Sequence, residues 1–306
     1  MLSVTYFKAL ADETRLRLVN LLMHHELNVN EIVKIMEMGQ SRISRHLKIL
    51  SDSGLLKSRR DGSWIFYSAS KSKNDPTALL LKELQTFFKS QKELVDDLHA
   101  LEELLKAKAN EKTDYFNTIA KNWDVIKKDI IGDLPITEEI ISALGKMESV
   151  ADLGCGTGHL LPILSSTVKK VIGVDKSENM LVEARKRFPS DKYNIDLRIG
   201  DIEHLPIRNE EVHSAIINMV LHHLESPSEC LLEVSRIIIK GGIVLIIDLE
   251  KHENEKYRKK YGHRWLGFSK EEMTIWLKNA RFKLKEFKNF STKKNITVNL
   301  FIAEKK

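Results

Sequence analysis

The chain has 306 residues, of which 42% are hydrophobic and 30% are charged, and its formal net charge at pH 7 is +6. This length predicts two domains, since one domain usually takes about 100–200 residues. The apolar stretches are much shorter than the roughly 20 residues of a membrane span, and the N-terminus lacks the apolar region of a signal peptide, so we expect a cytoplasmic protein. Cys155 and Cys230 are too few for a disulfide framework, and we expect both thiols to be reduced.

The first part of the chain is expected to hold a pair of short helices. Asn30 is a suitable N-cap for a helix over 31–36. Gly39 suits the turn that follows, and Ser41 is a suitable N-cap for a second helix over 42–52. Two helices joined by so short a turn are typical of a helix-turn-helix motif, whose second helix enters the major groove of DNA.

The second of these helices has two distinct faces. Ile43, Leu47 and Leu50 recur at helical spacing and are expected to face the core. The other face, with the residues at the start of the helix, is rich in hydrogen-bond donors suited to bases and phosphates. The candidate DNA-binding residues here are therefore Gln40, Ser41, Arg42, Ser44, Arg45, His46 and Lys48.

A hairpin is expected to follow this helix. Its strands would cover 55–60 and 63–69, joined by an Asp-Gly turn at 61–62. Arg59 and Arg60 lie near its tip, where the arginines of a winged helix commonly reach a minor groove or a phosphate. The alternative is a basic surface helix and hairpin with no role in nucleic-acid binding.

The segment 3–72 resembles the ArsR/SmtB family of bacterial repressors. The matching stretches are 7–18, 41–50 and 54–56. The resemblance implies a winged-helix domain over residues 1–75 and a homodimer that binds double-stranded operator DNA. Metal-sensing members carry two cysteines where this chain has Asn28 and Asn30, which cannot supply soft thiolate ligands. We therefore expect no metal at that site and a different effector.

Residues 76–112 are expected to form one long helix, or two, between the domains. They contain no glycine, and leucine and phenylalanine recur among them at helical spacing. A stripe of this kind packs against a neighbour. Here we expect the neighbour to be the same helix of a second subunit, in a homodimer.

Residues 113–306 alternate between expected strands and helices, which predicts an α/β doubly wound, Rossmann-like domain after the mainly α winged helix. The parallel sheet would be covered on both faces. No helix separates the last two strands, so these are expected to pair antiparallel as a hairpin. The expected strands cover 149–153, 171–175, 196–199, 214–218, 243–248, 283–290 and 296–303.

A glycine-rich loop follows the first of these strands, and a helix over 159–166 is expected directly after it. A dinucleotide-binding fingerprint reads G-x-G-x-x-G and directs a helix N-terminus at a pyrophosphate. Here the glycines read G-x-G-x-G, which suits a nucleoside ligand without phosphate, S-adenosylmethionine or S-adenosylhomocysteine. The loop residues expected to hold it are Asp152, Gly154, Cys155, Gly156 and Gly158.

Further polar residues stand at the carboxyl ends of later strands, where open α/β sheets bind ligands. Asp175 is placed to accept both ribose hydroxyls, and Asp201 to accept the adenine amino group with Ile202 against the ring. For each acid alone, a helix cap is the alternative. Other residues expected to line the same pocket are Lys176, Met180 and Asn218.

The segment 113–306 resembles the class I S-adenosylmethionine-dependent methyltransferases, in the branch that includes the ubiquinone/menaquinone enzymes. Besides the glycine loop, the resemblance is carried by 175–181, 200–206, 220–224 and 236–242. In related enzymes an aromatic residue ahead of the domain closes over the cofactor, which implies that role for Tyr115 and Trp123. Core packing is the alternative for both. Lys240 departs from the proline usual in this branch.

His222, His223 and His263 are the candidate catalytic residues, since a base is needed if the acceptor must lose a proton. The chain lacks the Pro-Pro-Tyr and Pro-Cys motifs of DNA methyltransferases and the several thiols of arsenite methylation. We therefore expect an unknown small-molecule acceptor and no metal. The alternative is a non-catalytic sensor, in which S-adenosylmethionine or S-adenosylhomocysteine changes the affinity for DNA.

Overall fold

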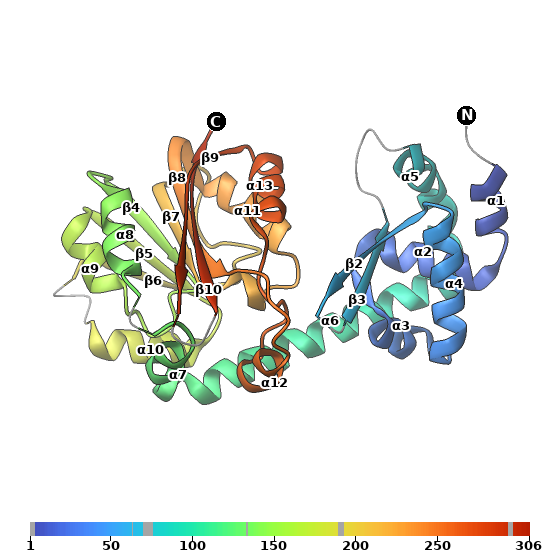
Figure 1. Cartoon of the computed structure of the whole chain (residues 1–306), viewed down its shortest axis with the longest axis horizontal. Helices are drawn as coiled ribbons and strands as arrows, with labels where there is room; N and C mark the ends of the chain where they lie inside the picture. The colour runs from blue at the N-terminus through green and yellow to red at the C-terminus, as the bar shows by residue number, and fades with distance from the viewer. Residues whose placement is uncertain (1–3, 63, 70–75, 133, 189–192, 293–295) are drawn as a thin grey trace. The chain divides into compact units, whose positions relative to one another are not determined.

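The computed structural model describes residues 4–62, 64–69, 76–132, 134–188, 193–292 and 296–306. The chain forms two compact units, Met1–Asn110 and Glu111–Lys306 (Figure 1). Among the described helices, none combines the length and the hydropathy of a membrane-spanning segment. The expected domain boundaries at 75 and 112 stay predictions.

The first unit begins with helices packed around an apolar core. Ile43, Leu47 and Leu50 are fully buried, as their spacing predicts. They share one cluster with Leu18 and Leu22 from an earlier helix. These helices are α1 (Val4–Leu10), α2 (Glu13–His24), α3 (Val29–Met36) and α4 (Gln40–Asp52).

Both expected helix caps in this region are wrong. The N-cap of α3 is Asn28, whose side chain accepts hydrogen bonds from the backbone of Asn30 and Glu31, while Glu31 bonds back to the Asn28 N–H. This reciprocal capping box needs an acid three residues after the cap, which Asn30 does not have. α4 begins after Gly39, so Ser41 lies inside its first turn, and no described side chain caps this helix.

The hairpin is present and gains a third strand. β2 (Leu56–Asp61) and β3 (Trp64–Ala69) pair antiparallel, and β1 (Leu27–Asn28) pairs with the other edge of β3. Asp61 lies opposite Trp64, so the turn is one residue later than expected and takes in Gly62, whose φ is 59°. Ser63, expected to begin the second strand, lies outside the described residues.

The described residues 76–119 form two helices, α5 (Pro76–Lys89) and α6 (Lys92–Ile119). Their apolar stripe packs onto the core of the first unit, since Leu81, Phe88, Leu94 and Leu101 all belong to its buried cluster. α6 extends beyond the expected linker and crosses the boundary between the two units. Dimerisation through this segment stays a prediction.

Within the described part of the second unit, one seven-stranded sheet has the order β6-β5-β4-β7-β8-β10-β9. Neighbouring strands in the run β6-β5-β4-β7-β8 pair in parallel, and β10 is antiparallel to both of its neighbours, β8 and β9. The sheet is therefore mixed, although the expected closing hairpin is confirmed. The strands are β4 (Ser149–Leu153), β5 (Lys170–Asp175), β6 (Ile195–Ile199), β7 (Val212–Asn218), β8 (Ile238–Leu249), β9 (Phe282–Ser291) and β10 (Thr297–Lys305).

The strand order reverses at β4, which determines where a ligand can bind. The chain runs outward from β4 to β6 and then returns to β7 on the other side of β4. Because crossovers between parallel strands are right-handed, this reversal places the two sets of connecting helices on opposite faces. Open α/β sheets generally bind ligands at such a reversal, which here lies at the carboxyl ends of β4 and β7.

The helices of the second unit begin close to where the sequence predicts them. The helix after the glycine loop starts at Leu161, two residues later than expected, because residues 159–160 are still in a turn. A single 3-10 turn, η2 (Leu221–His223), follows β7. The α-helices are α7 (Trp123–Ile131), α8 (Ile136–Leu144), α9 (Leu161–Thr167), α10 (Glu178–Arg187), α11 (Pro227–Ile237), α12 (Lys256–Tyr261) and α13 (Lys270–Asn279).

Candidate functional site

α4 presents a polar face to solvent in the first unit. Its exposed candidates for DNA contact are Gln40, Ser41, Arg42, Ser44, Arg45 and Lys48. His46 is different, because its side chain is 13% exposed and its Nδ1 lies 3.6 Å from Asp12 Oδ1. Burial lowers the pKa of His46, so the expectation that this imidazole points outward is wrong.

The two arginines of the hairpin also differ. Arg60 is exposed near the turn, where its Nε donates to the carbonyl of Gly62 at 3.0 Å. Arg59 is half-buried, pairs with Glu26 at 3.4 Å and lies over the ring of Phe66. Arg60 is therefore the better placed of the two to reach a ligand in solvent.

The glycine loop of the second unit lies at the carboxyl end of β4. Gly154, Gly156 and Gly158 have φ values of 75°, 55° and 79°, a region that L side chains rarely adopt. There is also no room for a side chain at two of these positions. A Cβ on Gly154 would lie 2.5 Å from Val220 Cγ2, and one on Gly156 would lie 3.1 Å from Trp123 Nε1. The loop is thus a cradle whose shape only glycine permits.

Asp175 at the end of β5 holds this loop in place. One carboxylate oxygen accepts the N–H of Gly156 at 2.8 Å, and the other accepts the N–H of Ser177 at 2.8 Å. Burial raises the pKa of Asp175 despite these hydrogen bonds. Each oxygen still has a second lone pair for a ligand donor. Its role toward ribose hydroxyls stays a prediction.

Asp152 lies within β4, 3% exposed, beneath the loop. Burial raises its pKa to about 7, and the nearby charge of Lys127 opposes that rise. Lys127 comes from α7, four residues after Trp123, so both side chains lie on one face of that helix. Burial lowers the pKa of Lys127, as expected for an ammonium group removed from water.

α7 is fixed to the loop by a further contact. Thr157 Oγ1 donates to Asp124 Oδ1 at 2.8 Å, and Arg187 of α10 also pairs with Asp124. The indole of Trp123 lies against Gly156, and its role at a cofactor stays a prediction.

Lys176 and Asp201, which follow the carboxyl ends of β5 and β6, form an ion pair. Lys176 Nζ lies 2.7 Å from Asp201 Oδ2. Burial opposes ionisation of Asp201, but hydrogen bonds from Lys176 and from the backbone of Glu203 outweigh it and lower its pKa. Ile202 and Met180 are buried beside the glycines, as an apolar wall for a ligand ring requires.

Other expected site residues take different positions. Cys155 Sγ packs against Gly173, and burial raises the pKa of this thiol, so any contact of Cys155 with a cofactor stays a prediction. Gly158 is packed against Leu161 and α10. Asn218, at the end of β7, has a buried Oδ1 with no partner among the described residues. An orphaned acceptor beside a closed cradle fits a ligand that carries amine or hydroxyl donors.

A row of aromatic rings leads from the cradle to the three histidines. Phe116 is central: its ring centroid lies 5.6 Å from that of Trp123 and 5.0 Å from that of His223. Tyr115 turns aside, with its ring against Gly262. Ring contacts of Phe116, and not of Tyr115, therefore connect Trp123 at the glycine loop with His223. That the loop and the histidines form one site stays a prediction.

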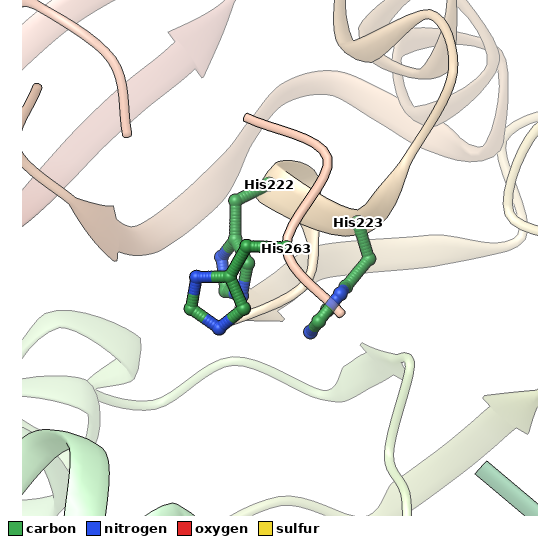
Figure 2. A group of neighbouring side chains, drawn as sticks. All are labelled: His222, His223 and His263. Carbon is green, nitrogen blue, oxygen red and sulfur yellow. The ribbon is translucent and has the colours of Figure 1, made fainter. Parts of the chain in front are cut away.

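His222, His223 and His263 come together although about 40 residues separate them (Figure 2). His222 Nδ1 lies 2.7 Å from Asp248 Oδ1, and His223 Nδ1 lies 3.4 Å from the Gly262 carbonyl. Both nitrogens of His263 are buried without a partner among the described residues. Burial, and then the neighbouring histidines, lower the pKa of His263, so it is neutral at physiological pH.

Comparison with known proteins agrees with this geometry. The family described as a methyltransferase domain matches residues 151–246, and the arsR family of bacterial regulatory proteins matches residues 12–58. A demethylmenaquinone methyltransferase of Desulfitobacterium hafniense is 32% identical over 175 residues, which cover 54% of this chain and 68% of that relative. The chain belongs to the methyltransferase family. Its N-terminal domain is of the ArsR type.

More distant relatives share the fold of the methyltransferase domain. A ubiquinone/menaquinone biosynthesis C-methyltransferase of Campylobacter jejuni is 24% identical, covering 62% of this chain and 95% of that relative. A solved complex of the Haloferax volcanii Trm112 activator with a putative methyltransferase matches with a TM-score of 0.53 and 19% identity, covering 62% of this chain and 96% of the matched one. The expected Rossmann-like methyltransferase fold is confirmed, and family membership agrees with S-adenosylmethionine as cofactor.

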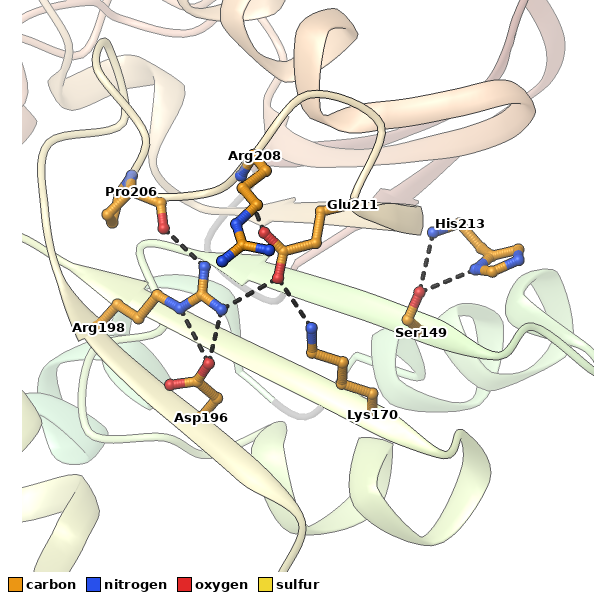
Figure 3. Close-up of polar contacts among 8 residues, drawn as sticks. All are labelled: Ser149, Lys170, Asp196, Arg198, Pro206, Arg208, Glu211 and His213. Carbon is orange, nitrogen blue, oxygen red and sulfur yellow. Dashed lines mark hydrogen bonds and ion pairs between the residues drawn. The ribbon is translucent and has the colours of Figure 1, made fainter.

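The opposite end of the methyltransferase sheet carries a different polar cluster (Figure 3). Glu211 accepts from Lys170 at 2.8 Å and from Arg198 at 3.1 Å, and Arg198 also binds Asp196. Burial disfavours the charge of Glu211, but these cations outweigh it and lower its pKa to about 2. An open pocket of about 570 Å³ lies here, lined by Lys170, Arg198, Glu211 and the segment 205–208. The Glu211 carboxylate is fully engaged by Lys170, Arg198 and the backbone N–H of Arg208, so we assign this cluster a structural role.

Sequence reasoning missed several residues of the methyltransferase site. Lys127, Asp124 and Asp248 stand on elements far from the glycine loop in sequence, and no local motif marks them. Phe116 follows Tyr115 directly, and only the direction of its side chain distinguishes it. A usable signal existed for Lys127, since it lies one helical turn after Trp123, which was already a candidate.

Proposed function

We propose that this chain is a transcriptional regulator that binds operator DNA through its ArsR-type domain and methylates a small molecule through its methyltransferase domain. The observation that carries the catalytic part is His263, whose two buried nitrogens have no partner among the described residues. Native cores rarely keep such groups, whereas sites that bind a substrate or ion do. A series of ring contacts from Trp123 through Phe116 and His223 to this imidazole supports the proposal.

S-adenosylmethionine is the cofactor, and it supplies an electrophilic methyl group when bound. The cradle of Gly154 and Gly156 would hold its aminoacyl part, with Asp175 at the ribose and Asp201 at the adenine. Trp123 would exclude water from the loop side. Methyl transfer depends mainly on such positioning and on the exclusion of water.

The acceptor is proposed to be a small molecule with an acidic hydroxyl group. Relatives of this methyltransferase domain are named for demethylmenaquinone and for ubiquinone/menaquinone biosynthesis, which suggests quinol-like rings as first candidates. An acceptor of this kind must lose a proton before or during transfer. The three histidines are the groups proposed to meet it.

A second candidate function is a sensor, favoured by the course of α6. In the first unit, Arg17 makes a bidentate pair with Asp97 of this helix, at 2.8 and 2.7 Å. In the second unit, Asn117 of the same helix accepts from Ser177, next to Asp175. We propose that S-adenosylmethionine or S-adenosylhomocysteine changes the affinity for DNA through this helix, which requires unequal binding to the two states.

Two assays test these functions separately. Transfer of a labelled methyl group to quinol-like acceptors or to a cell extract tests the enzyme, and a chain that turns over none of them contradicts it. Titration of an operator-binding assay with each ligand tests the sensor. A change in DNA affinity of less than about twofold, or ~0.4 kcal/mol, would contradict the sensor function.

A homodimer and a cytoplasmic location complete the proposal. The dimer follows from operator DNA as the partner, because the two half-sites of an operator mirror a protein with twofold symmetry. The location follows because a protein that binds operator DNA must share its compartment. Sedimentation of the full chain at micromolar concentration tests the dimer. A monomer that binds a whole operator with full affinity would contradict it.

A further inference from the structure

We propose that His222, His223 and His263 form a binding site for a divalent transition-metal ion, with Zn²⁺ as the best fit. Each histidine offers one ring nitrogen, and these three nitrogens lie within 4.8 Å of one another. Figure 2 shows the imidazoles grouped around one point, two from η2 and one from the segment after α12. The exposed fractions are 1%, 8% and 3%, so the cluster lies inside the protein.

The hydrogen bonds of two of these histidines match those of metal ligands. A histidine that binds a metal generally donates its other ring N–H to a carboxylate or a carbonyl, which sets the tautomer and the ring direction. His222 Nδ1 does so to Asp248 at 2.7 Å, and His223 Nδ1 to the Gly262 carbonyl at 3.4 Å. In both residues this assigns Nε2 to the metal.

Asp248 is itself held rigidly, as an orienting carboxylate should be. It accepts the backbone N–H of Leu249 at 2.7 Å and that of His222 at 3.3 Å, besides the His222 ring. The carboxylate is 1% exposed, so solvent does not compete for these bonds. The His222 ring therefore has one preferred direction, with Nε2 away from β8.

His263 supplies the independent observation. It is 3% exposed, and within the described residues neither of its nitrogens has a hydrogen-bond partner. Its ring lies 4.1 Å from that of His222 and 5.1 Å from that of His223, between centroids. A buried polar group without a partner needs an explanation, and an ion shared with its two neighbours provides one for one of the two nitrogens.

The ligand set points to zinc. Three neutral imidazoles with an open fourth position are the pattern of catalytic zinc sites. Zn–N bonds of about 2.0–2.1 Å would place the ligand nitrogens about 3.4 Å apart, so binding would draw the rings together by roughly 1 Å. The site is in the methyltransferase domain, unlike the thiolate site of metal-sensing ArsR proteins, whose cysteine positions are Asn28 and Asn30 here.

The open position gives the metal a role at the acceptor, and this consequence rests on the proposed function. An acceptor hydroxyl bound there would release its proton to water, because a metal ion stabilises the resulting oxyanion; the histidines would then act as metal ligands and not as the base. That oxyanion would then face the cofactor along the row of Trp123 and Phe116. The metal binding itself does not depend on any acceptor.

The test uses the full chain without a polyhistidine tag, stripped of metal by chelation. Zn²⁺ is titrated in competition with a chromophoric chelator, and Co²⁺ is bound in its place to read the ligand geometry from visible absorption. We expect about one equivalent of Zn²⁺ per chain and the intense bands of four-coordinate Co²⁺.

Substitutions then locate the ion. His263→Gln should weaken Zn²⁺ binding at least about 100-fold, and Asp248→Asn about tenfold to 100-fold. The matched control is His213→Gln, which changes a histidine bonded to Ser149 at the opposite end of β7 and should leave zinc binding intact. Far-ultraviolet dichroism and thermal unfolding establish that each variant is folded.

Two results would overturn the metal site: no stoichiometric Zn²⁺ binding by the wild-type chain, or equal binding by folded His263→Gln. The proposed function is judged apart from it. Methyl transfer that persists after chelation and is unaffected by added Zn²⁺ removes only the role of the metal at the acceptor, while the titration alone decides the metal site. Zinc binding at the histidines without any methyl transfer leaves the metal site standing and removes the enzyme.

Discussion

The two functional regions of this chain are built in opposite ways. The candidate DNA-binding residues come almost entirely from one helix, α4, and most of them remain exposed. The methyltransferase site gathers side chains from α6, α7, β4, β5 and η2, and it buries acids and imidazoles. Exposed charges act nearly independently and are screened by salt, whereas buried groups change one another's pKa and depend on their neighbours.

The largest effect is expected at the cradle of the buried region. In Gly154→Val the new side chain would meet Val220 and force a φ of 75° on a β-branched residue. We expect S-adenosylmethionine and S-adenosylhomocysteine to bind at least about 100-fold more weakly, measured by calorimetry. Gly241→Val is the control, because Gly241 has a φ of 76° but open space around it. Cofactor affinity within threefold of wild type in Gly154→Val would contradict a cofactor role for this loop.

A smaller loss is expected at the carboxylate that organises the loop. Asp175→Ala removes the acceptor for the N–H groups of Gly156 and Ser177 and for any ligand hydroxyl. Hydrogen bonds to a charged group are worth about 1.5–3 kcal/mol, so cofactor affinity should fall about tenfold to 100-fold in the same calorimetric assay. Asp196→Ala, on the neighbouring strand and outside the site, should leave it unchanged. If both variants lose affinity equally, the loss comes from general instability.

The exposed region should respond less to a single change and more to salt. Arg45→Ala is expected to weaken operator binding about tenfold and to reduce the slope of log affinity against log salt by about one. Lys89→Ala, an exposed cation of α5, is the control. His46→Ala should have a smaller effect than Arg45→Ala, because His46 faces Asp12. The reverse order would mean that His46 turns outward on DNA.

The smallest effect is a pH dependence that belongs to the buried region. The folded-state pKa of Asp152 is raised to about 7, so its stabilising contribution is present in acid and is lost as pH rises toward 7. Asp152→Asn cannot ionise. The free energy of unfolding of this variant, relative to that of wild type, should therefore increase by about 1 kcal/mol between pH 5 and pH 6. Urea denaturation at the two pH values measures this.

Glu211→Gln provides the contrast for that measurement. The pKa of Glu211 is lowered to about 2, so its contribution is complete above the unfolded value and falls only as the pH drops below about 4.5 toward 2. The difference in free energy of unfolding between Glu211→Gln and wild type should therefore stay constant between pH 5 and pH 6. A slope of the same size in both variants would mean that the pH effect does not arise at Asp152.

Short-range patterns predicted much of both regions. The core face of α4 was correct because apolar residues at helical spacing must share one side of a helix. The sharp turn of the glycine loop was correct because glycine readily adopts the positive φ values found there, and cofactor binding by this loop stays a prediction. The cap at Asn28 was within reach of the same reasoning, since Glu31 completes a capping box that was overlooked.

Long-range contacts explain what the patterns missed. His46 shares the polar face of α4 with Arg45, yet Asp12 of a separate segment turns it inward. Asp61 ends its strand one residue later than a turn dipeptide suggests, because cross-strand pairing with Trp64 decides the register. Neither outcome can be read from residues adjacent in the chain.

By itself, the sequence determined that an ArsR-type domain precedes a methyltransferase domain, and that a glycine-rich loop follows the first strand of that domain. Helical periodicity and glycine backbone freedom are local properties, and local properties can be read from order along the chain. Only the tertiary structure decided that Lys127 faces Asp152, that Phe116 joins the loop to the histidines, and that His263 meets His222 and His223. The strand reversal at β4 and the return of the chain after α12 bring these residues together, and their burial then sets their charge and their chemistry.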